Sequence, residues 1–302
     1  MNRISKMLLA FTACALCVAP AIAQDGTLKK IKDNGFITIG HRDASIPFSY
    51  YDDKQQPIGF AMDLCAKIVD AVKANLKMPN LQVKYQLVTS ANRIPLIANG
   101  TVDLECGSTT NNVERQKQVA FTITHFLTAN RYVTKKSAGI KSVDDLKGKT
   151  IVSTSGTTNI KQATELNTAK NMGMNIIPAN GHPEAFQMVE TGRAVAFVMD
   201  DILLYTLVAQ ASNPSDYVIS SDALSLPEPY GIMMHKDDAA FKKVADDAMT
   251  AVYKSGEINK IYAKWFTSPV PPKGINYNVP MSAQFKNLIA NPTSSGDPTV
   301  YK

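Results

Sequence analysis

The stretch "DDLKGKTIVSTSGTTNIKQATEL" (residues 144–166) holds the pattern that decides the fold. Its first residues are typical of a short helix, and the turn "KGK" separates that helix from a strand at Thr150–Thr154. Gly156 then turns the chain directly into a second helix. A strand, a tight turn and a helix in immediate succession are typical of an α/β fold with a largely parallel sheet.

The same order recurs on both sides of this stretch. Apolar residues at helical spacing predict a helix from about 59 to 77, and a strand at 37–40 precedes it. The alternation continues along both halves of the chain, with strands at 81–88, 102–107, 174–180 and 194–201 and helices at 91–100, 182–193 and 202–211. Two α/β units in tandem predict two lobes.

Two extended segments, 126–136 and 225–238, follow the first and the second unit. A chain that leaves a lobe and later returns makes two crossovers, and two crossover strands form a hinge. We therefore expect a first lobe of residues 24–131 and 227–302, and a second lobe of residues 132–226. Two helical patterns occupy 238–266, after which proline and glycine become dense, so we expect order to about residue 290 and a loose end beyond it.

The first 23 residues have the features of a secretory signal peptide. Arg3 and Lys6 precede an apolar run at 7–18, and Ala21 and Ala23 satisfy the small-x-small rule for cleavage. We expect cleavage after Ala23 and an exported protein, and the resemblance described below implies that it is periplasmic. No later stretch approaches the roughly 20 apolar residues that a spanning helix needs.

Composition excludes several classes of function. The formal charge of +6 falls to +4 without the two basic residues of the signal peptide, and no run of Lys or Arg is present, so no nucleic-acid partner is expected. "GKT" at 148–150 lacks the glycine that a phosphate-binding loop requires at position 143, which is valine. The four histidines lack metal-ligand spacing, and no GxSxG occurs, so we expect no metal, no cofactor and no catalytic residue.

Four cysteines divide into two pairs. Cys14 and Cys17 lie in the signal peptide, where Cys14 offers a weak alternative as a lipidation site. Cys65 lies on a predicted helix and Cys106 on a predicted strand. Export permits them to pair, but two small buried apolar residues is the favoured interpretation.

Two glycine turns rich in hydroxyl groups follow predicted strands: "CGSTTNNVER" (106–115) and "TSGTTNIKQ" (154–162). Ligands of open α/β sheets bind at the carboxyl ends of strands, and a helix that starts at the second turn would offer free N–H groups to an anion. Helix capping alone explains either turn about equally well. Arg115 favours a ligand site at the first turn, because a guanidinium grips a carboxylate with two parallel hydrogen bonds.

Four stretches together resemble the polar amino-acid solute-binding proteins that feed ABC importers. The similarity covers about residues 27–290, with the matching stretches in the same order and spacing: "GHRDASIPFSYYD", "TSANRIPLIANGTVDLECGSTTNNVERQKQ", "DLKGKTIVSTSGTT" and "TGRAVAFVMDD". The resemblance is to members that bind glutamate and aspartate. It implies the two-lobed periplasmic-binding-protein fold of type II, with a ligand trapped between the lobes.

The resemblance also implies a role for each site residue. Arg115, Ser108, Thr110 and Thr158 correspond to the residues that hold the ligand's α-carboxylate. An aspartate at the end of the "GRxxAxxxD" strand holds the α-ammonium, which points to Asp200, with its neighbour Asp201 as the alternative.

The remaining residues that the resemblance implies face the ligand's side chain. Arg42, Ser90, Arg93 and His182 correspond to the residues that bind a side-chain carboxylate. Members that bind glutamine or basic amino acids carry an aromatic residue near Ser90. Three arginines against one aspartate also disfavour a neutral ligand. Arg93 as a solvated helix residue, and His182 without ligand contact, stay open as alternatives.

The sequence thus predicts a monomeric, non-enzymatic protein that binds L-glutamate or L-aspartate with high affinity and delivers it to a membrane permease. One rival is binding of another anionic amino acid or carboxylate. A second is a cyclohexadienyl dehydratase-like enzyme, which needs a general acid in the cleft; no spare acidic residue is evident beside the site, although Asp43 stays possible. A third is the sensing domain of a receptor.

Overall fold

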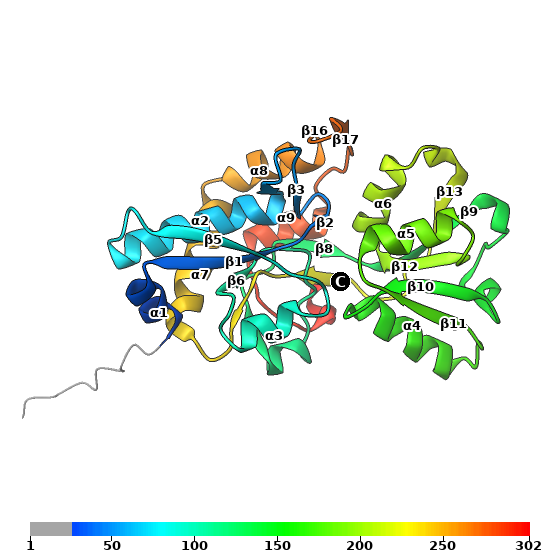
Figure 1. The fold of residues 1–302 in the computed structure, drawn as a ribbon, viewed down its shortest axis with the longest axis horizontal. Helices are drawn as coiled ribbons and strands as arrows, with labels where there is room; N and C mark the ends of the chain where they lie inside the picture. The colour runs from blue at the N-terminus through cyan, green and yellow to red at the C-terminus, as the bar shows by residue number, and fades with distance from the viewer. Residues whose placement is uncertain (1–25) are drawn as a thin grey trace, which may run out of the picture.

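The computed structural model describes residues 26–302, so the predicted signal peptide lies outside the described residues. Figure 1 shows two lobes side by side, joined near the middle of the molecule. Each lobe is built around its own five-stranded sheet with helices packed against it. The two-lobed α/β architecture predicted from the alternation of strands and helices is confirmed.

The sheet of the first lobe has the strand order β5-β1-β6-β15-β7. β1 (Phe36–His41) lies parallel to β5 (Gln82–Leu87) and to β6 (Leu104–Glu105). β15 (Met233–His235) enters antiparallel between β6 and β7 (Val119–Phe121). The chain that returns from the second lobe therefore adds an inner strand to the sheet of the first.

Helices cover this sheet. They are α1 (Thr27–Asn34), α2 (Phe60–Leu76), α3 (Arg93–Ala98), α7 (Ala239–Lys254), α8 (Glu257–Phe266) and α9 (Ala283–Ala290). α2 packs against α7 and α8, and its buried residues Leu64, Ile68 and Val72 recur at the spacing that predicts a helix there. Phe48, Phe60 and other aromatic rings meet edge-to-face in the core beneath them.

The second lobe repeats the plan with strand order β11-β10-β12-β9-β13. β10 (Thr150–Thr154), β11 (Asn175–Ala179) and β12 (Ala196–Asp200) are parallel, whereas β9 (Asn130–Lys135) and β13 (Tyr217–Ile219) belong to the antiparallel edge. Its helices are α4 (Thr158–Ala169), α5 (His182–Glu190) and α6 (Asp201–Gln210).

Two short strands connect the lobes. β8 (Phe126–Thr128) leads toward the second lobe, and β14 (Glu228–Tyr230) leads back from it. They pair antiparallel, with Glu228 opposite Thr128. This pair is the two-stranded hinge that the crossover segments predict.

Short elements complete the chain. They are the three strands β2 (Ala44–Ser45), β3 (Ser49–Tyr51) and β4 (Pro57–Ile58), the hairpin of β16 (Pro269–Val270) and β17 (Ile275–Asn276), and the single-turn 3-10 helices η1 (Arg115–Lys117), η2 (Lys136–Ala138), η3 (Val143–Leu146), η4 (Pro214–Asp216) and η5 (Pro298–Tyr301). No helix within residues 26–302 combines the length and the apolar character that crossing a membrane requires.

Two expectations are wrong. Cys65 and Cys106 form a disulfide bond rather than two separate apolar side chains. The bond ties α2 to the end of β6, directly before the turn that begins at Gly107. The end of the chain is also not loose, because the N–H of Thr124 donates to the carbonyl oxygen of Thr293 at 2.8 Å and Tyr301 is only 4% exposed.

Candidate functional site

The predicted site residues lie together where the two sheets face each other. β1 and β6 in the first lobe, and β10 and β12 in the second, all direct their carboxyl ends toward this junction. Seven of the nine line one cavity: Ser90, Arg93, Ser108, Thr110, Thr158, His182 and Asp200. Arg42 and Arg115 lie immediately behind it, hydrogen-bonded to Ser90 and Thr110 respectively.

The cavity itself is small because the lobes touch. Its volume is about 10 Å³, which corresponds to space for about one water molecule. The hydroxyl groups of Thr110 and Thr158 lie 3.5 Å apart across the junction. With the lobes in this arrangement, the cavity is too small for a ligand larger than a water molecule, so such a ligand enters only when the lobes move apart.

Backbone sets the closest approach of the lobes. Gly156, at the turn after β10, has φ of +74°, and a Cβ added there would lie 2.5 Å from the Cα of Ala91. Real Cβ atoms do not approach a Cα atom so closely, so only glycine permits this contact. The turn predicted to follow β10 is therefore also the place where the second lobe meets the first.

Arg42 is fully buried at the end of β1. Its backbone N–H donates to the Ser49 hydroxyl at 2.9 Å, and its Nη2 donates to the Ser90 hydroxyl at 2.9 Å. Burial, with the nearby charge of Arg93, lowers the pKa of Arg42 to about 10. The guanidinium still carries its charge at neutral pH.

Arg93 begins α3, and its side chain points inward. It is 2% exposed, which excludes the alternative of a solvated helix residue. Its Nη1 donates to the carbonyl oxygen of Ser108 at 3.3 Å and also to the hydroxyl of Thr109. The turn after β6 thus holds this guanidinium in place.

Glu105 is a buried carboxylate that the sequence prediction missed. It lies on β6, accepts a hydrogen bond from the Thr109 hydroxyl at 2.7 Å and lies 3.9 Å from Nη1 of Arg93. The expectation that no acidic residue accompanies the site is wrong. Asp43, the acidic neighbour left open, is exposed at the surface. The sequence held one indication that Glu105 is buried, namely its position between the apolar residues Leu104 and Cys106 at the end of a predicted strand.

Several buried polar atoms of the site have no hydrogen-bond partner among the described residues. Of the nine such side-chain atoms in residues 26–302, five belong to predicted site residues: Nε and Nη1 of Arg42, Nε of Arg93, Oγ of Ser108 and Nε2 of His182. Leaving a buried polar group unpaired costs about 1–3 kcal/mol, and more when the group is charged. The guanidinium donors among these atoms favour an anionic ligand at this end of the site.

Arg115 links the two lobes. It starts the single-turn helix η1, where its Nη1 donates to the carbonyl oxygen of Thr110 at 2.8 Å and its Nη2 to that of Gly156 at 3.3 Å. Burial, with the nearby charge of Arg93, lowers its pKa to about 9, so it stays a cation at neutral pH.

Glu228 is the second buried carboxylate that the sequence prediction missed. Its Oε2 accepts hydrogen bonds from Thr110 at 3.1 Å and from Thr158 at 3.2 Å, and Gln162 donates to its other oxygen. Thr110 belongs to the first lobe and Thr158 to the second. One carboxylate on the hinge strand β14 therefore holds a hydroxyl group from each lobe.

The structure separates the two candidate aspartates. Asp200, the last residue of β12, is 3% exposed and accepts hydrogen bonds from Asn159 and from the hydroxyl of Tyr230. Asp201 turns away, accepts from the Thr128 hydroxyl at 2.6 Å and has a side chain that is 37% exposed. Burial, reinforced by the charge of Glu228, raises the pKa of Asp200 to about 7.

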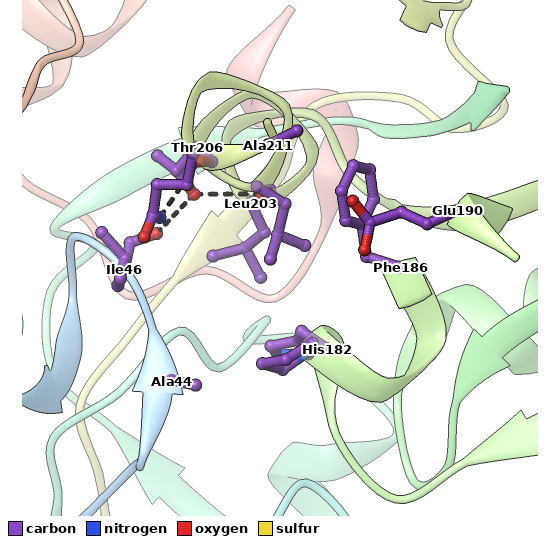
Figure 2. A pocket seen from close by; sticks show the side chains of 11 residues that line it. Ala44, Ile46, His182, Phe186, Glu190, Leu203, Thr206 and Ala211 are labelled. Carbon is purple, nitrogen blue, oxygen red and sulfur yellow. Dashed lines mark hydrogen bonds between the residues drawn. The ribbon is translucent and has the colours of Figure 1, made fainter. Parts of the chain in front are cut away.

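His182 begins α5 and separates the small cavity from a larger one. Its Nδ1 lies 2.8 Å from the Thr154 hydroxyl, and burial together with the charges of Arg42 and Arg93 holds its pKa well below the usual value. Figure 2 shows its ring facing Ala44 across the neighbouring cavity of about 270 Å³. Thr206 closes the far side of that cavity by donating to the carbonyl oxygen of Ile46 at 3.0 Å.

The second glycine turn caps its helix as well as facing the cavity. The hydroxyl of Thr157 accepts the N–H of Ile160, so Thr157 is the N-cap of α4 and Thr158 its first residue. The capping role and the site role are thus both present in adjacent threonines. Within residues 26–302, no group of three or more His, Cys, Asp or Glu is arranged to hold a metal ion.

Comparison with known proteins points in one direction. Residues 37–268 match the family model described as bacterial extracellular solute-binding proteins, family 3. The chain is 56% identical to the L-glutamate/L-aspartate-binding protein of Pseudomonas aeruginosa over 295 residues, covering 96% of this chain and 97% of that protein. It is 47% identical to the glutamate/aspartate import solute-binding protein of Escherichia coli, covering 96% of this chain and 98% of that protein.

A solved structure shows the same fold. The solute receptor for L-cysteine of Neisseria gonorrhoeae has a TM-score of 0.69 and 25% sequence identity, with 83% of this chain and 97% of that chain covered.

Proposed function

Because this chain belongs to the bacterial extracellular solute-binding proteins of family 3, we propose that it binds L-glutamate and L-aspartate between its lobes with high affinity and delivers them to the permease of an ABC importer. The observation that carries the proposal is the set of unpartnered donors on Arg42 and Arg93. They can take a second carboxylate, which distinguishes acidic amino acids from all others.

The α-carboxylate is assigned to the Arg115 end of the site. Arg115, Ser108, Thr110 and Thr158 supply the donors, assisted by the free N–H groups at the start of α4. A hydroxyl group has one hydrogen to donate. Thr110 and Thr158 must therefore turn their hydrogens from Glu228 to the ligand when it binds.

The α-ammonium is assigned to Asp200. Its carboxylate is buried in the cavity wall, whereas that of Asp201 points toward the hinge and Thr128. An ammonium group brought against a buried carboxylate restores the ionised form of that carboxylate.

The side-chain carboxylate is assigned to Arg42, Ser90, Arg93 and His182. The predicted balance of three arginines against one aspartate is wrong, because Glu105 and Glu228 are buried at the site together with Asp200. Glu105 lies near Arg93, but the donors named above stay unpaired. A neutral side chain such as that of glutamine would pair them poorly, which favours glutamate and aspartate.

Lobe closure couples these contacts. Arg115 belongs to the first lobe, and Thr158 and Asp200 belong to the second, so one ligand makes all its contacts only when the lobes meet. The hinge pair β8 and β14 lies directly behind the site. The predicted boundary at residues 226/227 lies just before β14, but the one at 131/132 falls inside β9 (Asn130–Lys135), which pairs with β12 in the sheet of the second lobe, so we place the first boundary before Asn130 instead.

The relatives that match over nearly the whole chain are named as binding proteins, and this chain is a binding protein rather than an enzyme. We further propose that it is exported to the periplasm, with cleavage after Ala23, and acts there as a monomer.

Calorimetric titration tests the proposal. The mature chain, stripped of bound ligand by unfolding and refolding, is titrated with glutamate, aspartate, glutamine, arginine and citrate. We expect tight 1:1 binding of glutamate and aspartate alone. Tight binding of a neutral amino acid or of citrate, without binding of the acidic pair, would overturn the assignment of Arg42 and Arg93.

A further inference from the structure

We propose that the C-terminal segment of residues 293–301 positions the loop that carries Arg115, and that Asn111 and Gln116 are the positioning residues through which it acts. The inference rests on the proposed function, because it concerns the affinity of that site. We call residues 110–116 the binding loop and residues 293–301 the strap.

The strap lies outside the part of the chain that matches the family model, which ends at residue 268. Figure 1 marks the C-terminus in the space between the two lobes, far along the chain from the strands that carry the site. Gly296 and Pro298 line a cavity of about 170 Å³ together with Thr110, Thr158 and Glu228. The strap thus reaches the junction of the lobes.

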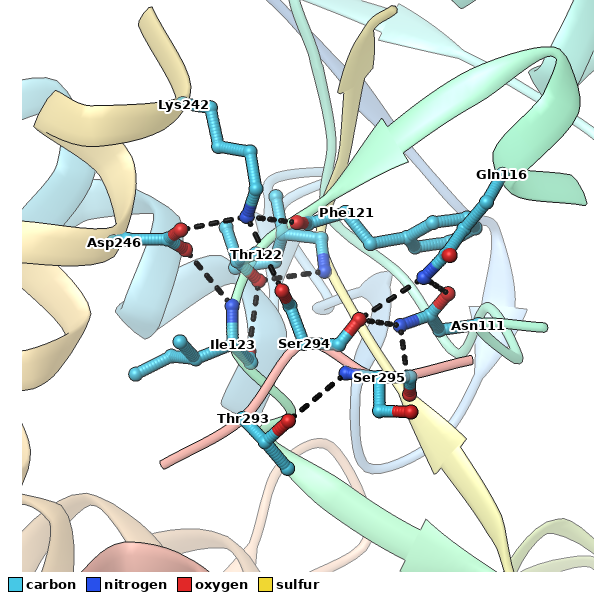
Figure 3. Close-up of polar contacts among 11 residues, drawn as sticks. Asn111, Gln116, Phe121, Thr122, Ile123, Lys242, Asp246, Thr293, Ser294 and Ser295 are labelled. Atoms are coloured by element: carbon cyan, nitrogen blue, oxygen red, sulfur yellow. Dashed lines mark hydrogen bonds and ion pairs between the residues drawn. The ribbon is translucent and has the colours of Figure 1, made fainter. Parts of the chain in front are cut away.

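The binding loop and the strap are joined by a network of amide groups, shown in Figure 3. Asn111 is fully buried, and its Nδ2 donates to the carbonyl oxygens of Ser294 at 3.0 Å and Ser295 at 3.3 Å. Gln116 donates from Nε2 to the carbonyl oxygen of Ser294 at 3.0 Å and to Oδ1 of Asn111 at 2.8 Å. The two side chains at the ends of the loop therefore converge on one backbone carbonyl of the strap.

The strap is itself anchored to the first lobe. Tyr301 donates its hydroxyl hydrogen to the carbonyl oxygen of Ser295 at 2.7 Å and lies 2.9 Å from the hydroxyl of Thr124. A Cβ added to Gly296 would lie 2.7 Å from the backbone of Asn112 and Val113. The strap consequently lies against the loop backbone as well as its side chains.

These contacts bear on the arginine because the loop is short. The N–H of Arg115 donates to Oδ1 of Asn112 at 2.8 Å, and its Nη1 donates to the carbonyl oxygen of Thr110 at 2.8 Å. On its other side the loop is held by β14, where the N–H of Asn111 donates to the carbonyl oxygen of Pro229 at 2.7 Å. Without the strap, β14 and the packing of η1 against β7 would still hold the loop, but the buried amide group of Asn111 would lose both of its carbonyl acceptors.

A positioning role predicts a specific signature in the binding data. The strap contacts the loop at the α-carboxylate end of the site, whereas Arg42 and Arg93 are held by Ser90 and by the turn after β6. Weakening the strap should therefore lower the affinities for glutamate and aspartate by the same factor and leave the ratio of glutamate to glutamine affinity unchanged. A general loss of stability would not produce that pattern at temperatures well below unfolding.

Two variants of Gln116 test the inference in the mature chain. Gln116→Ala removes two donors, and Gln116→Glu keeps the size of the side chain but turns an oxygen toward the carbonyl of Ser294. Gln118→Ala is the matched control, because Gln118 is the same type of residue, is exposed and makes no side-chain hydrogen bond to the described residues of the binding loop or the strap. Titration with glutamate, aspartate and glutamine is combined with hydrogen–deuterium exchange of the binding loop and a thermal unfolding curve.

We expect Gln116→Ala to weaken binding of both acidic amino acids about fivefold, as the loss of about one net hydrogen bond implies. Gln116→Glu should weaken binding further, both Gln116 variants should speed hydrogen exchange in the binding loop, and Gln118→Ala should match the wild type. The proposed role of the strap would be wrong if both Gln116 variants bound with wild-type affinity. It would also be wrong if the ratio of glutamate affinity to glutamine affinity changed. If the wild type bound neither acidic amino acid, the proposed function would be wrong. Faster hydrogen–deuterium exchange of the binding loop in Gln116→Glu would still support the positioning role of the strap, and unchanged exchange would contradict it.

Discussion

The Nη2 atom of Arg115 lies 3.3 Å from the carbonyl oxygen of Gly156, so that one guanidinium from the first lobe contacts the backbone of the second. Because its Nη1 is held by the carbonyl of Thr110, the cation is already oriented before any ligand contact is considered. A pre-oriented donor loses little conformational freedom when it binds a carboxylate.

We expect Arg115→Ala to abolish measurable binding of every amino acid, a loss of at least about 100-fold, because it removes charge-assisted hydrogen bonds to the α-carboxylate that all amino acids share. The control is Arg193→Ala, which removes an exposed guanidinium from the second lobe. Calorimetry on both variants checks the result. If Arg115→Ala bound glutamate with normal affinity, the assignment of Arg115 to the α-carboxylate would be wrong.

Gly156→Ala should block closure. The new Cβ would lie 2.5 Å from the Cα of Ala91, so the lobes cannot reach the observed contact. Gly192→Ala is the matched control, since Gly192 has φ of +75° against +74° for Gly156 but no atom within 4 Å of the added Cβ. Both variants should lose similar stability, about 1–2 kcal/mol from the left-handed backbone, and only Gly156→Ala should lose affinity.

Small-angle scattering provides the second readout for this pair. With saturating glutamate, the control should contract as the wild type does, and Gly156→Ala should stay extended. Equal affinity and equal contraction of the two variants would contradict a backbone limit to closure.

Arg93→Ala should reduce the difference between the binding affinities for glutamate and for glutamine. The change removes a cation assigned to the side-chain carboxylate, so glutamate loses more binding free energy than its neutral analogue does. Parallel titrations with the two amino acids measure the ratio of their affinities. An unchanged ratio would mean that Arg93 does not contact the side chain of the ligand.

Affinity should fall as the pH falls below about 7. Burial and the charge of Glu228 raise the pKa of Asp200 to about 7, so the free protein holds a proton there at lower pH. Ammonium binding needs the ionised carboxylate and must displace this proton, which weakens binding by up to about tenfold per pH unit. Titrations between about pH 5.5 and 8, where the carboxylates of the ligand stay ionised, check the slope.

Neighbouring aspartates provide the control for that prediction. Asp201→Asn should bind glutamate with the same pH dependence as the wild type, because its carboxylate faces Thr128. Asp200→Asn should bind weakly at every pH. The assignment of the α-ammonium to Asp200 would be wrong if the affinity of the wild type did not depend on pH. It would also be wrong if Asp201→Asn bound weakly and Asp200→Asn bound normally, which would favour Asp201.

The disulfide should contribute strongly to stability. Cys65 and Cys106 are 41 residues apart, and closing a loop of that length stabilises the folded state by about 4 kcal/mol in the chain-entropy account. Cys65→Ala/Cys106→Ala should unfold at lower urea concentration, and added reductant should affect only the wild type. Equal urea midpoints for wild type and double variant would show that the bond adds nothing.

The elements with strong local patterns could be predicted from the sequence. The periodicity of α2 places it within one residue of its observed ends, and the strand Thr150–Thr154 is found as predicted. Both patterns depend on neighbouring residues alone, because helical spacing and the turn at Gly156 are local properties of the backbone. The nine site residues were implied by the family resemblance, and seven of them line one cavity in the structure.

Contacts between distant segments could not be predicted in the same way. Glu228 accepts hydrogen bonds from Thr110 and Thr158, which are distant in sequence, so no local pattern indicates that its carboxylate is buried. For Glu105 the apolar residues on either side were the one local indication. The pairing of Cys65 with Cys106 depends on how α2 lies across β6. The strap was missed because proline-rich and glycine-rich sequence is compatible both with a loose end and with a fixed irregular segment.

The contact of Gly156 with Ala91 has a consequence for how substrate range can change over evolutionary time. At this contact main chain meets main chain, and no side chain that selects the ligand is part of it. Substitutions at Arg42, Arg93 or His182 can therefore change which ligand is bound, while the permease still binds the same closed arrangement of the two lobes. Selection can therefore change the ligand that is bound without changing the surface that the permease recognises.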